Sequence, residues 1–170
     1  MFNLLKKEIK GIVYSPVKKG KVIKIEEVPD DSFAQKLLGE GVGFINEDNA
    51  LYAPCNGLII MTQPTKHAIG IKSNDGVEIL IHIGLDTVDL NGKGFTSYVK
   101  KGDKVKKGDM LISFDKEFMV KNNIDLVTPM VITNSSDYDI ELLVTEDNVN
   151  LNREIIKVKK MIVNESNKKI

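Results

Sequence analysis

The chain has 170 residues, 42% hydrophobic and 28% charged, which predicts one soluble globular domain with a sizeable core. Lysine plus arginine and aspartate plus glutamate number 24 each, so the formal net charge is zero and no nucleic-acid partner is expected. A single cysteine excludes an intrachain disulfide. No apolar run is long enough to span a membrane and no signal peptide is recognisable, so we expect a cytoplasmic protein.

Short β-prone runs follow one another along the chain, separated by turn signals such as Lys19-Gly20, Asn56-Gly57 and Asn91-Gly92. The predicted strands are 22–25, 57–61, 69–72, 77–83, 110–114, 129–133 and 155–158. Two segments, 32–38 and 114–123, predict short helical turns. Many short strands punctuated by glycine predict an all-β antiparallel sandwich or barrel.

The two ends of the chain are expected to differ from its centre. Residues 1–14 are predicted as a separate, flexible N-terminal segment, 15–160 as the domain, and 161–170 as a disordered tail. The N-terminal segment is mildly amphipathic and basic, which leaves two interpretations open. It either contacts an anionic membrane surface or forms a frayed end or first strand.

The only two histidines, His67 and His82, flank a predicted β-hairpin. Its turn signal is Ser73-Asn74-Asp75-Gly76. If the loop is Asn74-Asp75, the histidines are paired directly, and if it is Asp75-Gly76, they are diagonal neighbours on one face. A three-residue loop without a bulge would place them on opposite faces instead. The favoured two-residue loops therefore predict a histidine pair.

Under either two-residue loop, the histidines stand at one end of an apolar shelf formed by Ile69, Ile71 and Leu80. Packing alone rarely accounts for two imidazoles on an apolar face, so the pair is interpreted as functional. Two adjacent neutral imidazoles can share a metal ion, a proton or a transferred phosphoryl group. Turn geometry alone leaves these three uses open.

The most specific motif follows the hairpin turn and reads Gly76-Val-Glu-Ile-Leu-Ile-His-Ile-Gly-Leu-Asp-Thr-Val-Asp-Leu-Asn-Gly-Lys-Gly-Phe95. Supporting pieces are Val28-Pro29-Asp30, Phe33-Ala34, Thr65-Lys66-His67-Ala68 and Thr128-Pro129-Met130. In these segments the chain resembles the glucose-type IIA components of the bacterial phosphoenolpyruvate:sugar phosphotransferase system. The resemblance extends from Ser15 to about Lys159 and implies an antiparallel β-sandwich of the duplicated hybrid motif type.

The resemblance also implies a phosphotransferase activity. His82 would accept a phosphoryl group from the histidine phosphocarrier HPr and pass it to a cysteine of a sugar permease IIB domain. His67 would donate a hydrogen bond to the phosphoryl oxygens, and Thr65 would hold His67 in the required tautomer. No cofactor is implied, because a phosphohistidine donor is already activated. A regulatory role toward other enzymes or transporters is a compatible addition.

The same resemblance implies a docking surface around the histidines. Asp86 and Glu40 match acidic positions that receive an arginine of HPr. The matching apolar rim consists of Leu80, Ile69, Val42 and Val88. An apolar surface with charges at its edge is the usual anatomy of a transient protein interface.

Two further hypotheses compete with the phosphocarrier. A zinc peptidase of the LytM type would use His82, Asp86 and His67 as ligands, but that family needs a further histidine and the chain has only two. Adventitious zinc between His67 and His82 remains compatible with either reading. The third hypothesis is a non-catalytic regulatory module that binds partners through the same face.

Overall fold

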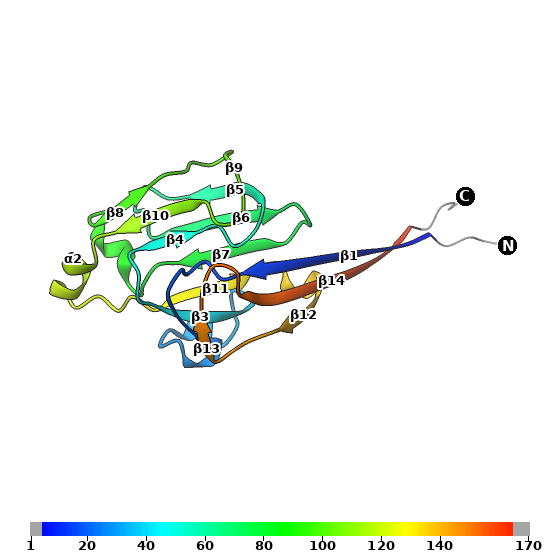
Figure 1. The fold of residues 1–170 in the computed structure, drawn as a ribbon, viewed down its shortest axis with the longest axis horizontal. Coiled ribbons are helices and arrows are strands. Elements are labelled where there is room, and N and C mark those ends of the chain that lie inside the picture. The colour runs from blue at the N-terminus through cyan, green and yellow to red at the C-terminus, as the bar shows by residue number, and fades with distance from the viewer. Residues whose placement is uncertain (1–4, 165–170) are drawn as a thin grey trace.

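The computed structural model describes the backbone of residues 5–164 and the side chains of residues 7–160, and strands dominate it (Figure 1). The strands are β1 Leu5–Tyr14, β2 Gly20–Lys24, β3 Glu40–Asn46, β4 Ala50–Tyr52, β5 Gly57–Thr62, β6 Ala68–Ser73, β7 Glu78–His82, β8 Phe95–Ser97, β9 Lys104–Val105, β10 Met110–Phe114, β11 Thr128–Ile132, β12 Asp139–Leu142, β13 Asp147–Val149 and β14 Glu154–Asn164. The helices are α1 Asp31–Ala34 and α2 Lys116–Lys121, with 3-10 turns η1 Ile25–Glu27, η2 Thr87–Leu90 and η3 Ser135–Asp137. All strand pairs recorded are antiparallel, which confirms the predicted all-β class.

The strands form one large sheet and two small ones. The large sheet has the order β13-β2-β3-β11-β7-β6-β5-β9, and the small sheets are β1-β14-β12 and β4-β10-β8. The main core joins residues of all three, including Ile71 of β6, Leu111 of β10 and Val158 of β14. The two small sheets therefore cover the inner face of the large one, as in a sandwich.

The outer face of the large sheet carries a second, smaller apolar cluster. Strand alternation puts Ile79 and Ile81 of β7 in the main core and leaves Leu80 on the outer face. There Leu80 packs with Phe33 of α1, with Val131 of β11 and with the η1 segment. This cluster brings α1 next to the end of β7, where His82 lies.

The predicted division of the chain at residues 14 and 161 needs correction. Residues 5–14 form β1, which pairs with β14 from Leu5 opposite Asn164 to Tyr14 opposite Glu154. Residues 161–164 thus belong to a strand, because backbone pairing with β1 continues past the core. The two strands project as a ribbon from the body (Figure 1). The predictions for residues 1–4 and 165–170 lie outside the described residues.

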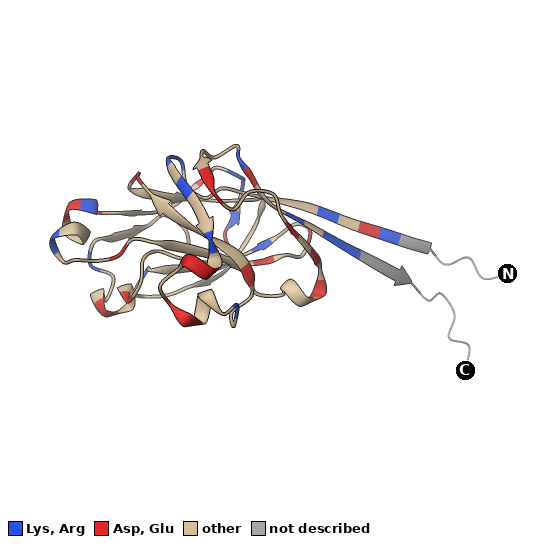
Figure 2. Cartoon of the chain, turned by 90° about the horizontal axis from the view of Figure 1, so that it is seen from below, with Lys and Arg blue, Asp and Glu red and all other residues tan. Residues whose placement is uncertain are grey.

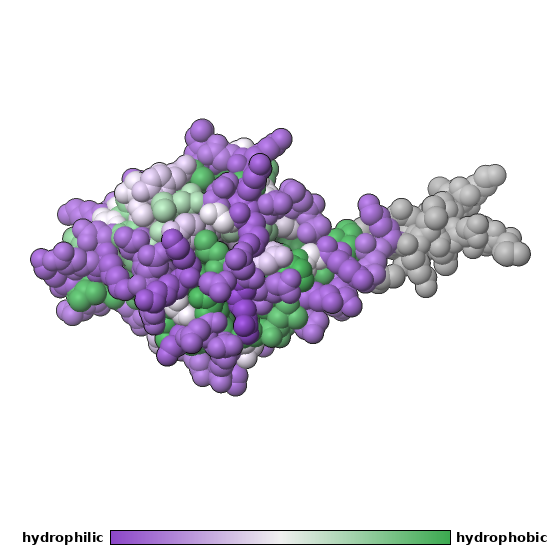
Figure 3. Space-filling model, in the orientation of Figure 1, coloured by the Kyte–Doolittle hydropathy of each residue, from purple (hydrophilic) through white to green (hydrophobic). Residues whose placement is uncertain are grey.

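Charge is unevenly distributed over this ribbon. Lysines recur on both strands, and Glu8 and Glu154 are the acidic residues among their described side chains (Figure 2). On the face of the body shown in Figure 3, hydrophilic residues cover most of the surface, with hydrophobic patches between them. None of the helices in the described part of the chain is long and apolar enough to cross a membrane.

Candidate functional site

The hairpin that carries the histidines has a three-residue loop. Ala68, not His67, lies opposite His82, and Lys72 lies opposite Glu78. The loop closes with the Gly76 N–H donating to the Ser73 carbonyl at 2.9 Å, and Gly76 has a φ of +87° that favours glycine. The predicted two-residue loops were therefore wrong, because the left-handed glycine adds one residue to the turn.

The two imidazoles nevertheless meet. Their ring centroids lie 4.9 Å apart with an interplanar angle of 87°. His67 precedes β6 and directly follows Lys66, whose φ of +57° turns the chain out of the strand pleat. The His67 carbonyl still accepts the Ile83 N–H at 2.7 Å. Proximity was thus predicted correctly, although the register that suggested it was not.

The surroundings of the pair differ from the predicted shelf. Ile69 and Ile71 are both fully buried, on the core face of β6. Phe33 of α1 packs against His82 instead, with the ring centroids 5.4 Å apart. The sequence identifies Phe33 only as part of a family motif, because nothing in its local pattern reveals that α1 folds onto the hairpin.

Burial decides the protonation of both rings. Desolvation is the main cause that lowers the pKa of His82 to about 4; the nearby His67 also lowers it, and Asp30 acts in the opposite direction. Desolvation also lowers the pKa of His67, whose residue is only 4% exposed. Both imidazoles are therefore neutral near pH 7, and each offers a nitrogen lone pair.

Thr65 fixes the orientation of His67. Its Oγ1 lies 2.7 Å from His67 Nδ1 and 3.5 Å from the Gln63 side-chain oxygen. When the hydroxyl donates to Nδ1, the remaining proton of the neutral ring sits on Nε2. The predicted Thr65–His67 contact is present.

A small hollow of about 130 Å³ opens beside the rings, lined by Asp30, His67, His82 and residues 84–88. Gly84 has a φ of +73°, and a Cβ there would lie 2.7 Å from the Asp125 carbonyl oxygen. The chain can therefore turn sharply after His82 only with glycine at this position. The Thr87 hydroxyl donates to the Ile83 carbonyl at 2.7 Å and closes this turn.

Acidic residues reach the site from two sides. Asp86, for which the sequence predicts a docking role, is exposed on the rim of the hollow. Asp30 also lines the hollow, although it was not among the predicted site residues. Its carboxylate accepts the Ser32 N–H at 2.9 Å and so caps α1, a structural role that gives no sign of a place in the site. Glu40 is not among the lining residues, and its carboxylate pairs with Lys36 at 3.1 Å.

The predicted apolar rim divides into exposed and buried members. Val88 is 48% exposed and Leu80 is partly exposed, so both can contact a partner. Val42 and Ile69 are fully buried in the main core, which corrects their assignment to the rim. Leu37, just after α1, is 70% exposed and was not predicted as part of this surface.

The sequence of the chain matches a known protein family over most of its length. Residues 11–138 match the family described as phosphoenolpyruvate-dependent sugar phosphotransferase system, EIIA 1. The chain belongs to this family. The match spans the histidine hairpin, α1 and β11, which are the elements that build the site.

Individual EIIA relatives agree. The glucose-specific EIIA component of Halalkalibacterium halodurans is 48% identical over 123 residues, covering 72% of this chain and 70% of that protein. The glucose-specific EIICBA component of Staphylococcus saprophyticus is 46% identical over 146 residues, or 86% of this chain, which spans only 21% of that longer protein. The glucose permease IIA structure from Mycoplasma capricolum superposes with a TM-score of 0.79 at 34% identity, covering 92% of this chain and 97% of that one.

The zinc peptidase alternative is not favoured for this EIIA chain. Within residues 7–160, no three histidine, cysteine or carboxylate side chains come together in a way that could hold a metal ion. His67 and His82 meet, but Asp86 stands on the rim of the hollow rather than completing a ligand set with them.

Proposed function

We propose that this protein is a cytoplasmic phosphocarrier that takes a phosphoryl group from phospho-HPr onto His82 during glucose uptake. The group then passes to a cysteine of a permease IIB domain. The observation that carries the proposal is the edge-on contact of His82 with His67, whose other nitrogen is held by Thr65. The relatives' names supply the sugar: both EIIA and EIICBA relatives are glucose-specific components.

The transfer needs only a neutral nucleophile and donors around the phosphoryl group. A ring nitrogen of His82 attacks phosphorus, its lone pair forms the new N–P bond, and the old N–P bond breaks with its electron pair returning to the donor imidazole. One N–P bond replaces another, so no nucleotide or further reactant is consumed. The lowered pKa of His82 keeps its lone pair available at pH 7.

His67 acts as the supporting donor in this proposal. A proton on Nε2, opposite the Nδ1 that contacts the Thr65 hydroxyl, points a hydrogen bond at the phosphoryl oxygens. Because His67 is nearly fully buried, its ring is held in place before the partner arrives. This lowers the reorganisation needed as negative charge develops in the transition state.

The surface around the pair supports docking of a partner with a cationic patch. Asp86 is exposed beside the apolar side chain of Val88, and Leu37 adds apolar surface near α1. Carboxylates beside a phosphoryl acceptor would repel phosphate unless a cation from the partner neutralises them. An arginine of HPr between Asp86 and the phosphoryl group would meet this requirement.

Incubation with phosphoenolpyruvate, Enzyme I and HPr, followed by mapping of acid-labile phosphate, tests the proposal. We expect label on His82 and none in a His82→Gln variant. His67→Gln is the matched control, since it removes an imidazole from the same site but should still accept label. Undiminished labelling of the His82→Gln variant would contradict the assignment.

A further inference from the structure

Strand β1 leaves one of its edges unpaired. It pairs with β14 on one side, and the order β1-β14-β12 puts no strand of the described chain on its other side. Part of β1 projects beyond the body (Figure 1). The side chains of Lys7, Glu8 and Lys10 are exposed. An exposed strand edge of this kind is a template for pairing with a further strand.

The backbone groups on this edge follow from hydrogen bonds at the end of the strand. The Tyr14 N–H donates to the Pro54 carbonyl at 2.9 Å and so points away from β14. The next residue, Ser15, points the other way, because its N–H donates to the Arg153 carbonyl just before β14 at 2.9 Å. Backbone direction alternates along a strand. The even-numbered residues of β1, including Glu8, Lys10 and Ile12, therefore present their N–H and carbonyl groups on the free edge.

The charges on this edge are self-complementary in one register. If β1 pairs antiparallel with β1 of a second copy about a two-fold axis at Ile9, Glu8 lies opposite the partner's Lys10, and Lys10 lies opposite the partner's Glu8. An axis at Glu8, at Lys10 or at Lys7 would instead place that residue opposite its own copy. Like charges directly opposite each other destabilise a strand pair, whereas opposite charges stabilise it. The sequence of the edge thus favours the axis at Ile9 over the neighbouring registers.

The backbone direction suits the same axis. Ile9 is odd-numbered and points its N–H and carbonyl to β14, so Ile9 and the partner's Ile9 would form a non-hydrogen-bonded pair, the type in which side chains lie closest. Ile9 is half-buried, and contact between two β-branched side chains stabilises a strand pair. On either side of the axis, a Glu8–Lys10 pair would exchange two backbone hydrogen bonds.

The ion pair within each copy is compatible with this arrangement. Lys10 Nζ lies 3.4 Å from Glu8 Oε2, and both side chains are on one face of β1 because they are two residues apart. Two such pairs side by side in opposite directions form a square of alternating charges. Each lysine then has two glutamate neighbours. Lysine on an edge strand ordinarily discourages pairing, and here the opposing glutamate removes that repulsion.

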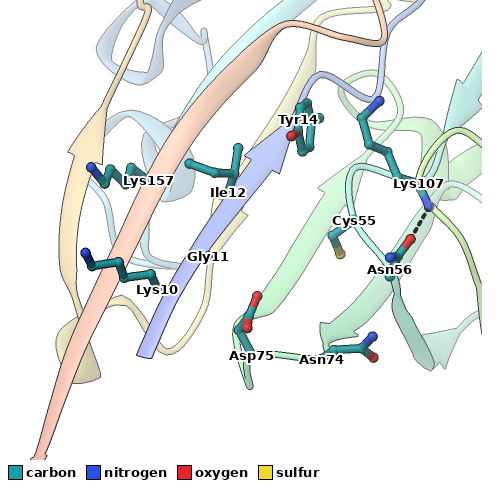
Figure 4. Close-up of a pocket in the computed structure, with 10 residues that line it drawn as sticks. All are labelled: Lys10, Gly11, Ile12, Tyr14, Cys55, Asn56, Asn74, Asp75, Lys107 and Lys157. Atoms are coloured by element: carbon teal, nitrogen blue, oxygen red, sulfur yellow. Dashed lines mark hydrogen bonds between the residues drawn. The ribbon is translucent and has the colours of Figure 1, made fainter. Parts of the chain in front are cut away.

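The body leaves space where the partner strand would approach it. Pairing about Ile9 places the partner's Lys6 opposite Ile12. A hollow of about 640 Å³ lies beside Ile12, and the β6–β7 turn at Asn74 and Asp75 forms its other side (Figure 4). His67 is at the opposite end of β6 from this turn, roughly 20 Å away, so the histidine pair stays outside the contact.

We propose that two copies of this chain associate edge to edge through β1, about a two-fold axis at Ile9. The two ribbons then join into one sheet of order β12-β14-β1-β1-β14-β12. One strand from each copy makes a small interface, so the association is weak and reversible, with a Kd on the order of 0.1–1 mM.

Sedimentation equilibrium of the full chain at concentrations up to roughly 1 mM tests the proposal. We expect a monomer–dimer equilibrium. Glu8→Lys and Lys10→Glu should each weaken dimerisation at least tenfold, because each creates two like-charge pairs across the axis. An equimolar mixture of the two variants should form a heterodimer, since the lysines of one then face the glutamates of the other. The double variant Glu8→Lys/Lys10→Glu should dimerise like the parent.

Helix α2 provides matched controls away from the ribbon. Glu117→Lys and Lys121→Glu make the same charge changes and break an exposed ion pair of 3.5 Å, but should dimerise like the parent. Thermal unfolding verifies that each variant is folded.

Disulfide trapping tests the register. Residues in a non-hydrogen-bonded pair have Cα atoms about 4.5 Å apart, which a disulfide can bridge. Ile9→Cys should therefore form a covalent dimer on oxidation, whereas Lys7→Cys should form far less, since Lys7 would face the partner's Gly11. The natural Cys55 is buried and remains free in both. A monomeric parent at roughly 1 mM, unchanged dimerisation of Glu8→Lys, a mixture that does not form heterodimers, or equal trapping at positions 7 and 9 would overturn the proposal.

Discussion

His82 should titrate far below an exposed histidine, and Phe33 should be a principal cause. The Phe33 ring lies 5.4 Å from the imidazole, and burial is the largest contribution that lowers the pKa of His82 to about 4. Replacing Phe33 with alanine lets water reach the ring and lowers the cost of charging it. We expect the pKa of His82 in Phe33→Ala to rise toward its ordinary value of 6.5.

The size of the effect follows from the two pKa values. A fall from 6.5 to about 4 corresponds to roughly 3 kcal/mol in favour of the neutral ring, and water at the exposed edge reduces this to on the order of 2 kcal/mol. At pH 5.5 a ring with a pKa of about 4 is about 97% neutral, whereas one with a pKa of 6.5 is about 9% neutral. Phosphoryl acceptance at pH 5.5 should thus fall by up to about tenfold in the variant.

Two-dimensional NMR of the ¹⁵N-labelled imidazoles measures the pKa of His82 directly. Unlike the phosphorylation assay, it does not contain HPr, whose own titration would also change the rate with pH. Phe33→Leu is the matched control, because it keeps an apolar side chain over His82 and should shift the pKa less. Both variants are first compared with the parent by thermal unfolding, since losing a buried phenyl ring typically costs about 3–5 kcal/mol. A parent His82 that titrates near 6.5, or an identical pKa in Phe33→Ala, would refute the reasoning.

The same shift makes folding stability depend on pH. Because the folded pKa of His82 lies below its unfolded value, the unfolded chain binds the proton first as pH falls. The stability contributed by the neutral ring is complete above pH 6.5 and is lost between pH 6.5 and about 4. Urea unfolding across this window should show a shallower decline for His82→Gln than for the parent.

The remaining predictions concern two residues beside His82 and two residues that were predicted to form the apolar rim. His67→Gln should accept phosphoryl from phospho-HPr but pass it poorly to a IIB domain; equal single-turnover rates would remove its supporting role. Thr65→Val should keep the fold but slow transfer by roughly tenfold, because the His67 tautomer is no longer held; an unchanged rate would show that the hydroxyl is dispensable. Val88→Asp should weaken HPr binding without a loss of stability, because Val88 is exposed. Ile69→Ala should lower the free energy of unfolding by about 2–5 kcal/mol, because it leaves a cavity in the core, and urea denaturation measures this loss. Impaired docking by a fully folded Ile69→Ala would contradict its placement in the core.

The sequence predicted strands well where an apolar run lay between clear turns. The runs at 57–61 and 110–114 became β5 and β10 with nearly the same bounds. β3 was not predicted, because its glycines at 41 and 43 lower its β propensity. They are accommodated by tertiary structure: a Cβ on Gly41 would lie 2.0 Å from the Met130 carbonyl oxygen of the neighbouring strand. The need for glycine at position 41 arises from contact with β11, which is distant in sequence, so the local sequence does not reveal it.

The site was predictable to the extent that it is local. His67, His82 and Thr65 lie on one hairpin, so their proximity followed from the chain itself. Phe33 and Asp30 reach His82 from α1, and only the packing of the outer cluster places them there. The opposite faces of Leu80 and Ile69 depended on a one-residue difference in turn length, which reverses every side chain of a strand.

The pairing of β1 with β14 has a consequence for how this domain joins others. Leu5 lies opposite Asn164, so the chain enters and leaves the domain at one place, through the two-stranded ribbon of β1 and β14. A covalent connection at either end therefore attaches at the same point and leaves the β6–β7 histidines at the far side of the body unobstructed. The domain can be tethered to a neighbour or stand alone without rearrangement of its site. Circular permutation that joins the two ends of the ribbon should also preserve the fold.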